Sequence, residues 1–197
     1  MSTSSRADGP KRSEESKNTA GQRTSTSGKQ GSTARKVAVG AVFTALALVF
    51  SWIEFLLPGV GIPGVKLGLA NLIIVIVVYR LGYRYAWIVN IARIVLAGLM
   101  FTGLFSMLYS LAGGVVSLTV MCLLHRTGMF SVIGVSMGAA VAHNFGQILV
   151  ASFVIEDIRM FSYFPVLVLS GIVSGILIGI AAHLIMKRLP TADPGAS

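Results

Sequence analysis

One long apolar region dominates the chain, running from Val37 to Met186 with few charged residues inside it. The 197 residues have a mean hydropathy of +0.80, 54% are hydrophobic and only 12% are charged, whereas about a quarter of the residues of a soluble domain are charged. The sequence therefore predicts an all-α integral membrane protein.

Charges, prolines and glycines divide this region into six apolar segments, most of them near the ~20 residues that cross a bilayer as a helix. The second and third segments are short, and we expect them to extend into their flanks. The segments are Val37–Leu57, Leu67–Tyr79, Tyr85–Met100, Phe105–Leu124, Val132–Ile155 and Pro165–Met186. No charge separates the third from the fourth, which meet near Thr102-Gly103. A merged run of about 40 residues would be roughly twice as long as the ~30 Å hydrocarbon core is thick, so two helices joined by a tight turn are expected. Residues 35–188 are predicted to form a six-transmembrane-helix bundle.

Two tails flank the predicted bundle. Residues 1–34 are rich in Ser, Thr, Gly, Lys and Arg and lack an apolar period, which predicts a disordered basic tail; residues 189–197 form a short C-terminal tail. Most Lys and Arg residues near the segment ends share one side, namely Arg35, Lys36, Arg80, Arg84, Arg126, Lys187 and Arg188, while Lys66 and Arg159 lie on the other. The positive-inside rule then places both termini in the cytoplasm.

The stretch Ser51–Asn71 is the first interruption of the apolar region and combines charged, amide, proline and glycine residues. We interpret it as a re-entering loop between the first two helices that caps a binding cavity, with Pro58–Pro63 as the lid. Ionisable groups within a bilayer face a bundle interior or a cavity. The predicted substrate-binding residues lie between the membrane midplane and the outer surface: Glu54, Lys66, Asn71, Arg93, His143, Asn144 and Gln147. Asn90 lies towards the cytoplasm.

Structural roles remain open for the same residues. Arg93 could form a buried bridge with Glu54 or with polar side chains of the fifth helix, which would only fix packing. His143 alone is typical of a buried, hydrogen-bonded histidine, but Gln147 shares its helix face, and so many donors and acceptors on one helix need partners. The positive charges of Lys66 and Arg93 against one Glu54 favour an anionic or zwitterionic ligand.

Small residues recur every four positions in three segments, at Ala41 and Ala45, at Gly134, Gly138, Ala142 and Gly146, and at Gly171, Gly175 and Gly179. Such faces let helix backbones approach closely in lipid. For the fifth and sixth helices we expect packing within the chain. The Ala41/Ala45 face admits two interpretations, packing within the chain or docking of another subunit.

No catalytic or metal-binding motif accompanies these residues. The sequence contains no aspartate-rich diphosphate motif, Walker lysine loop, HExxH or GxSxG, so the chain is predicted not to be an enzyme and to hold no cofactor. Cys122 is the only cysteine, which excludes an intramolecular disulfide and a cysteine-based metal site. Eight of the 16 Lys and Arg residues precede Val37, so the basic charge indicates a tail and short loops, not a partner nucleic acid.

Three motifs in the same order resemble a known family. They are Pro63–Asn71 (PGVKLGLAN), Ser110–Ser117 (SLAGGVVS) and the span from Gly134-Val135-Ser136 to Ala142-His143-Asn144-Phe145-Gly146-Gln147. The chain resembles the Gx transporter family, also labelled heptaprenyl diphosphate synthase component I, over about residues 36–188. That family is similar to S components of energy-coupling-factor transporters, which have six helices, an outward-facing pocket under the first loop and an Ala-x-x-x-Ala face that contacts a coupling subunit. The resemblance implies a multi-pass protein of a prokaryotic-type plasma membrane and favours Ala41 and Ala45 as a partner interface.

The two labels of this family imply different functions. The leading hypothesis is a substrate-binding component of an uptake transporter that captures a small solute, with ATPase subunits and a coupling transmembrane protein as separate chains. The alternative is a non-catalytic membrane accessory subunit, component I, of heptaprenyl or polyprenyl diphosphate synthase. A third possibility, a proton-coupled carrier, has the least support because Asn90 is the only polar candidate on the inner side of the site.

Overall fold

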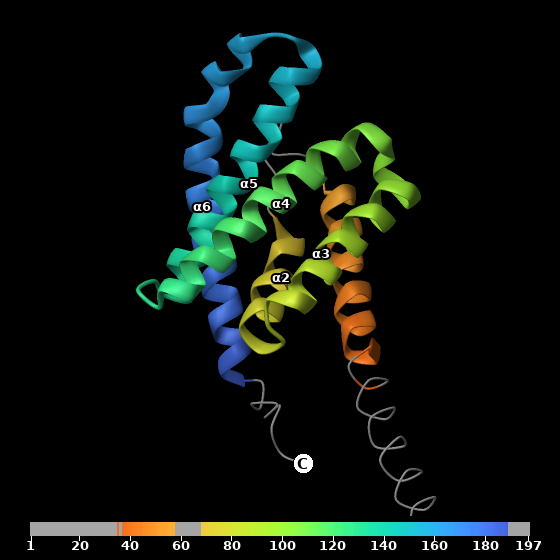
Figure 1. Cartoon of the computed structure of the whole chain (residues 1–197), viewed down its shortest axis with the longest axis vertical. Helices are drawn as coiled ribbons and strands as arrows, with labels where there is room; N and C mark the ends of the chain where they lie inside the picture. Colours follow the sequence, from red (N-terminus) through yellow and green to blue (C-terminus); the bar gives the residue numbers. More distant parts are fainter. Residues whose placement is uncertain (1–34, 36, 58–67, 189–197) are drawn as a thin grey trace, which may run out of the picture. The chain divides into compact units, whose positions relative to one another are not determined.

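The computed structural model describes residues 35, 37–57 and 68–188, and every regular element in them is helical. The helices are Val37–Leu56, α2 (Leu69–Arg80), α3 (Tyr83–Ala97), α4 (Gly103–Thr127), α5 (Val132–Ile155) and α6 (Phe164–Arg188) (Figure 1). A π-helical turn, Gly98–Thr102, precedes α4, and a 3-10 turn, Ile158–Tyr163, precedes α6. The prediction of an all-helical fold is confirmed for these residues. Both predicted tails, Lys66 and the predicted lid Pro58–Pro63 lie outside the described residues.

The chain forms two units, Met1–Val39 and Gly40–Ser197. Of the first unit the structure describes only Arg35 and the first three residues of the Val37–Leu56 helix, which are exposed or half-buried. All contacts discussed below lie within the second unit.

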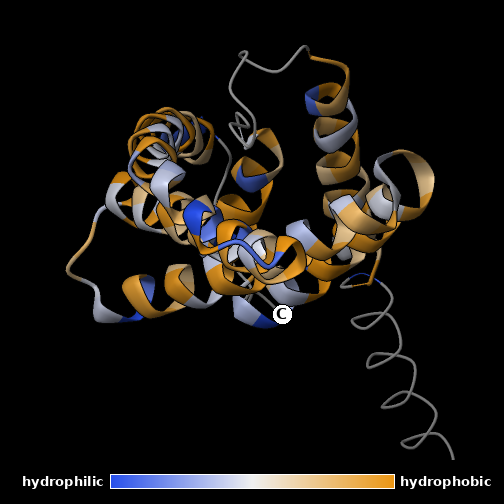
Figure 2. Ribbon diagram, turned by 90° about the horizontal axis from the view of Figure 1, so that it is seen from above, coloured by the Kyte–Doolittle hydropathy of each residue, from blue (hydrophilic) through white to orange (hydrophobic). Residues whose placement is uncertain are grey.

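Four helical stretches are long and apolar enough to cross a membrane: Val37–Leu56, Tyr83–Thr127, Val132–Ile155 and Ile158–Arg188. Apolar residues run along most of the helical ribbons (Figure 2), and many large ones are exposed, among them Leu99, Phe153 and Leu169. Such surfaces are expected where lipid is the solvent. By length and composition, the described part of the chain is therefore that of a membrane protein. The apolar helix α2 has only 12 residues and is short for a membrane span.

The stretch Tyr83–Thr127 is a hairpin of two helices, α3 and α4. Asn90 Nδ2 donates a 3.1 Å hydrogen bond to the carbonyl oxygen of Gly114, and Gly98 lies against the side chain of Met107, so the two helices pack antiparallel. The chain reverses at Gly103, whose φ of +82° favours glycine. The predicted division near Thr102-Gly103 is confirmed.

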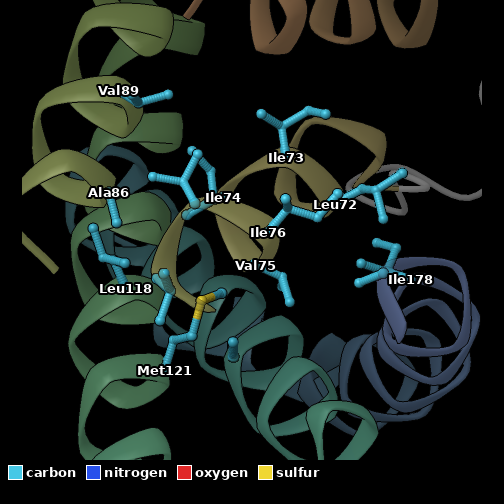
Figure 3. Packing of buried hydrophobic residues seen from close by; sticks show 14 of the residues in the cluster. Leu72, Ile73, Ile74, Val75, Ile76, Ala86, Val89, Leu118, Met121 and Ile178 are labelled. Atoms are coloured by element: carbon cyan, nitrogen blue, oxygen red, sulfur yellow. The ribbon is translucent and has the colours of Figure 1, made fainter. Parts of the chain in front are cut away.

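Helix α2 is the centre of the hydrophobic core. Ala70 and every residue from Leu72 to Val78 are buried, and a helix that is apolar all round is expected to be surrounded by other elements. The same cluster includes side chains of the Val37–Leu56 helix and of α3, α4, α5 and α6, among them Ala86 of α3, Leu118 of α4 and Ile178 of α6 (Figure 3).

The glycine faces of α5 and α6 bring α4, α5 and α6 together. On α6, Gly171, Gly175 and Gly179 lie against the backbone of Val141, Met137 and Ile133 on α5. On α5, Gly138 lies against Leu124, and Gly146 lies against the backbone at Ala112, both on α4. The predicted packing within the chain is thus confirmed for these glycines, and it keeps α5 close to both neighbours.

The Val37–Leu56 helix contacts the core along one stripe only. Ala47 is completely buried, and Phe43 and Phe50 pack against the core at positions four before and three after it. Ala41 and Ala45 are exposed. The face that carries them is therefore not covered by the part of the chain that the structure describes.

Candidate functional site

Arg93 is the centre of a polar cluster inside the helical domain, with only 8% of its surface exposed. Its Nε and Nη2 donate to Oδ1 of Asn90 at 3.2 and 3.0 Å, and Nη2 also donates to Oδ1 of Asn71 at 3.1 Å. Asn90 lies three residues before Arg93 and shares its face of α3, whereas Asn71 lies in the first turn of α2. Two amide oxygens from different helices therefore hold the guanidinium in place.

The cluster extends to α4 through Asn90, which is 2% exposed. Its Nδ2 donates to the carbonyl oxygen of Gly114. A Cβ atom at Gly114 would lie 2.7 Å from Cδ1 of Ile94 and 3.1 Å from Nδ2 of Asn90. Glycine at this position therefore allows α3 to approach α4 closely enough for the hydrogen bond, and the cluster links three helices.

Glu54 ties the end of the first described helix to the start of α2. Its Oε1 accepts a hydrogen bond from the backbone N–H of Gly68, the residue directly before α2, whose φ is +71°. A carboxylate is stabilised at a helix N-terminus by the unpaired N–H groups and the helix dipole. Glu54 also attracts Arg93 electrostatically, so it lies near the cluster and contributes negative charge there.

His143 and Gln147 face α4 at the glycine next to Gly114. A Cβ at Gly113 would lie 2.8 Å from Cγ of Gln147 and 3.0 Å from Cε1 of His143. The two side chains share one face of α5, as their spacing predicts. Gly113 therefore faces the polar residues of α5, while its neighbour Gly114 faces the Asn90 amide of α3.

Asn144 faces a different neighbour. Its Nδ2 donates to the carbonyl oxygen of Leu167 on α6 at 2.7 Å, beside the close approach at Gly171. This contact stabilises the pairing of α5 with α6 and is separate from the contacts of Arg93.

Asn90 was noted in the sequence as a polar residue on the cytoplasmic side but was not predicted to belong to the site. The expected partners of Arg93 were Glu54 or polar residues of the fifth helix, but the structure gives it Asn90 and Asn71. The sequence signal was the i, i+3 spacing of Asn90 and Arg93 in an apolar helix. Of the predicted site residues, Asn71 and Arg93 are in direct contact and Glu54 is nearby.

A second polar group lies at the opposite end of α2. The hydroxyl of Tyr83 and Nδ1 of His125 are 2.7 Å apart, and the ring of Tyr79 packs edge-on against His125 at a centroid distance of 4.4 Å. Arg80 donates to the carbonyl oxygen of Met186 near the end of α6. These contacts join the last turns of α2, α4 and α6 to the first turn of α3.

Comparison with known proteins gives one family. The model of heptaprenyl diphosphate synthase component I matches residues 43–185, which include every residue of the arginine cluster and the polar residues of α5. No curated protein and no solved structure matches the chain. The family description names one component of a synthase, which agrees with the prediction that the chain is not itself an enzyme. Because the match covers well over half of the sequence, the chain belongs to the heptaprenyl diphosphate synthase component I family.

Proposed function

We propose that this chain is the membrane-embedded, substrate-binding component of an uptake transporter. The observation that carries the proposal is the buried Arg93, which two amide side chains orient within a membrane-type helical domain. An ionisable residue inside a membrane domain costs at least ~2.5–3.5 kcal/mol on the insertion scale, so it is a functional candidate by default.

In this proposal the domain crosses the membrane six times with both termini in the cytoplasm, in a prokaryotic plasma membrane. The captured small solute contacts Arg93 and Asn71, and Glu54, Lys66, His143, Asn144 and Gln147 line or support the site. The exposed Ala41/Ala45 face receives a coupling transmembrane protein, and separate ATPase subunits supply energy. Docking at that face would bias the helices towards releasing solute inward.

The family description favours a second candidate function. Heptaprenyl diphosphate synthase component I is by its description one part of a synthase, and this chain would then be a membrane accessory subunit that holds a catalytic partner. The exposed Ala41/Ala45 face serves this proposal as well, since small residues in a helix let another chain approach closely.

Native mass spectrometry with co-purification distinguishes the two proposals. We would purify the wild type, an Arg93→Ala/His143→Ala double variant and an Arg159→Gln control, which removes a positive charge from an exposed turn. If the chain is a transporter component, a small molecule should be bound to the wild type and to the control but not to the folded double variant. ATPase subunits should also co-purify with the wild type. A stoichiometric prenyl synthase, with no small molecule on any of the three proteins, would contradict transport and favour the accessory function.

A further inference from the structure

We propose that Arg93 binds an anionic group, a carboxylate or a phosphate, on the captured molecule. This inference rests on the proposed substrate-binding function and names the chemical class of the ligand. The inference starts from the charge of the Arg93 guanidinium, whose hydrogen-bond partners carry no negative charge.

The partners of the guanidinium are neutral. Nε and Nη2 donate only to the amide oxygens of Asn90 and Asn71. Among the described residues Arg93 forms no ion pair with a carboxylate. The nearby carboxylate, Glu54, accepts its hydrogen bond from Gly68 instead. The two amides fix the orientation of the guanidinium without neutralising it.

One nitrogen of the guanidinium remains available. Arginine has five N–H donors in a planar fork, and the hydrogen bonds to Asn90 and Asn71 use Nε and Nη2. Nη1 has no hydrogen-bond partner among the residues that the structure describes and is not one of their fully buried unsatisfied atoms. The two N–H groups of Nη1 therefore have no acceptor among those residues and can donate to a ligand.

Burial explains why these donors favour an anion over a neutral acceptor. Arg93 is 8% exposed, and a buried charge is costly unless it is paired. A carboxylate or phosphate would place a negative charge in direct contact with the guanidinium, which Glu54 does not, and would offer strong acceptors to Nη1. Because Asn90 and Asn71 already hold the side chain, little rotamer entropy remains to be lost on binding.

A charge-compensation variant tests this inference. In Asn71→Asp, a carboxylate replaces the amide whose Oδ1 lies 3.1 Å from Nη2 of Arg93, and the other amide atom, Nδ2, forms no hydrogen bond to the described residues. The variant supplies an internal anion with almost no change in size. Arg93→Gln removes the charge, and two exposed-turn variants are matched controls: Arg159→Gln removes a positive charge and Ser162→Asp adds a negative one.

The assay is thermal unfolding in phosphatidylcholine nanodiscs at constant ionic strength, with acetate, citrate, inorganic phosphate or pyrophosphate as the anionic probe and glucose as the neutral probe. We expect at least one anion, and not glucose, to raise the melting temperature of the wild type and both controls. The apparent affinity for that anion should fall roughly ten- to hundredfold in Arg93→Gln and in Asn71→Asp. Arg93→Gln loses the charged donor, and in Asn71→Asp an internal carboxylate already neutralises it. If no anion stabilises the wild type more than Arg93→Gln, or if Asn71→Asp responds fully, the inference is wrong.

Two further arms separate this inference from the proposed function. Nanodiscs containing phosphatidylglycerol test a lipid headgroup as the source of the anion; stabilisation by this lipid alone, lost in Arg93→Gln, supports anion binding but contradicts solute capture. Native mass spectrometry of the purified wild type tests the reverse case. A retained neutral or cationic solute, released by Arg93→Gln, supports solute capture and overturns anion binding.

Discussion

Replacing Gly175 with alanine should destabilise the domain through the contact between α5 and α6. A Cβ at this position would lie 2.5 Å from Cα of Met137 and 3.0 Å from the carbonyl oxygen of Ser136, whereas ordinary contacts begin at 3.4 Å. Both atoms belong to the backbone, so no side-chain rotation relieves the overlap. The two helices would have to separate locally by about 0.9 Å, the difference between the 2.5 Å contact with Met137 and the 3.4 Å at which ordinary contacts begin.

Overpacking of this kind lowers the free energy of unfolding by roughly 1–3 kcal/mol. The better helix propensity of alanine offsets up to about 1 kcal/mol of it. We take a net cost of roughly 1–2 kcal/mol from these two terms. At about 2–4 °C per kcal/mol for a chain of this size, the melting temperature should fall by roughly 2–8 °C.

Cys122 provides the assay, since it is the only cysteine in the sequence and is half-buried in α4. A thiol-reactive fluorogenic dye should report its exposure as purified protein unfolds. Gly134→Ala is the matched control, because the nearest atom to its Cβ would be Cδ1 of Phe130 at an ordinary 3.5 Å. If both variants melt at the same temperature, close helix approach at Gly175 does not stabilise the fold and our interpretation of the glycine face is wrong.

Three further substitutions test individual hydrogen bonds with the same dye assay. Glu54→Gln keeps an acceptor for the N–H of Gly68 but removes the charge at the start of α2, so stability should fall by about 0.3–1 kcal/mol; unchanged stability would contradict the cap. Tyr83→Phe removes the hydroxyl 2.7 Å from Nδ1 of His125 and should cost about 1 kcal/mol, with a shift of the imidazole NMR signals that a mere packing change would not produce. Asn144→Ala removes the 2.7 Å hydrogen bond to the carbonyl oxygen of Leu167 and should cost about 0.5–1.5 kcal/mol; a retained bound solute in this variant would argue against a direct contact between Asn144 and the solute.

The helix positions could be predicted from the sequence because apolar length and its interruptions determine them. The segment Val132–Ile155 coincides with α5, and the reversal at Gly103 falls where no charge marks a boundary. That division was predicted from the length of the apolar run, and the positive φ of Gly103, +82°, explains why the chain can reverse at a glycine. Membrane crossing by α2 could not be derived in the same way, because its 12 residues are also typical of a buried core helix.

The partners of the polar residues could not be predicted, because sequence spacing gives a helix face but not the neighbour opposite it. His143 and Asn144 are adjacent in sequence, yet one faces α4 at Gly113 and the other faces α6 at Leu167. Consecutive residues differ by ~100° around a helix, so one position decides which helix a side chain meets. The arrangement of the helices shows that Asn71 belongs to the arginine cluster, whereas Asn144 belongs to a separate contact between α5 and α6.

The burial of α2 also affects how the domain responds to its lipid environment. No residue of α2 is exposed, whereas helices in contact with lipid adjust to bilayer thickness by tilting or by deforming the bilayer. A thinner or thicker membrane therefore acts on the outer helices directly and reaches α2 only through them. Since Asn71 lies in the first turn of α2, a change in bilayer thickness reaches that end of the arginine cluster only through the outer helices.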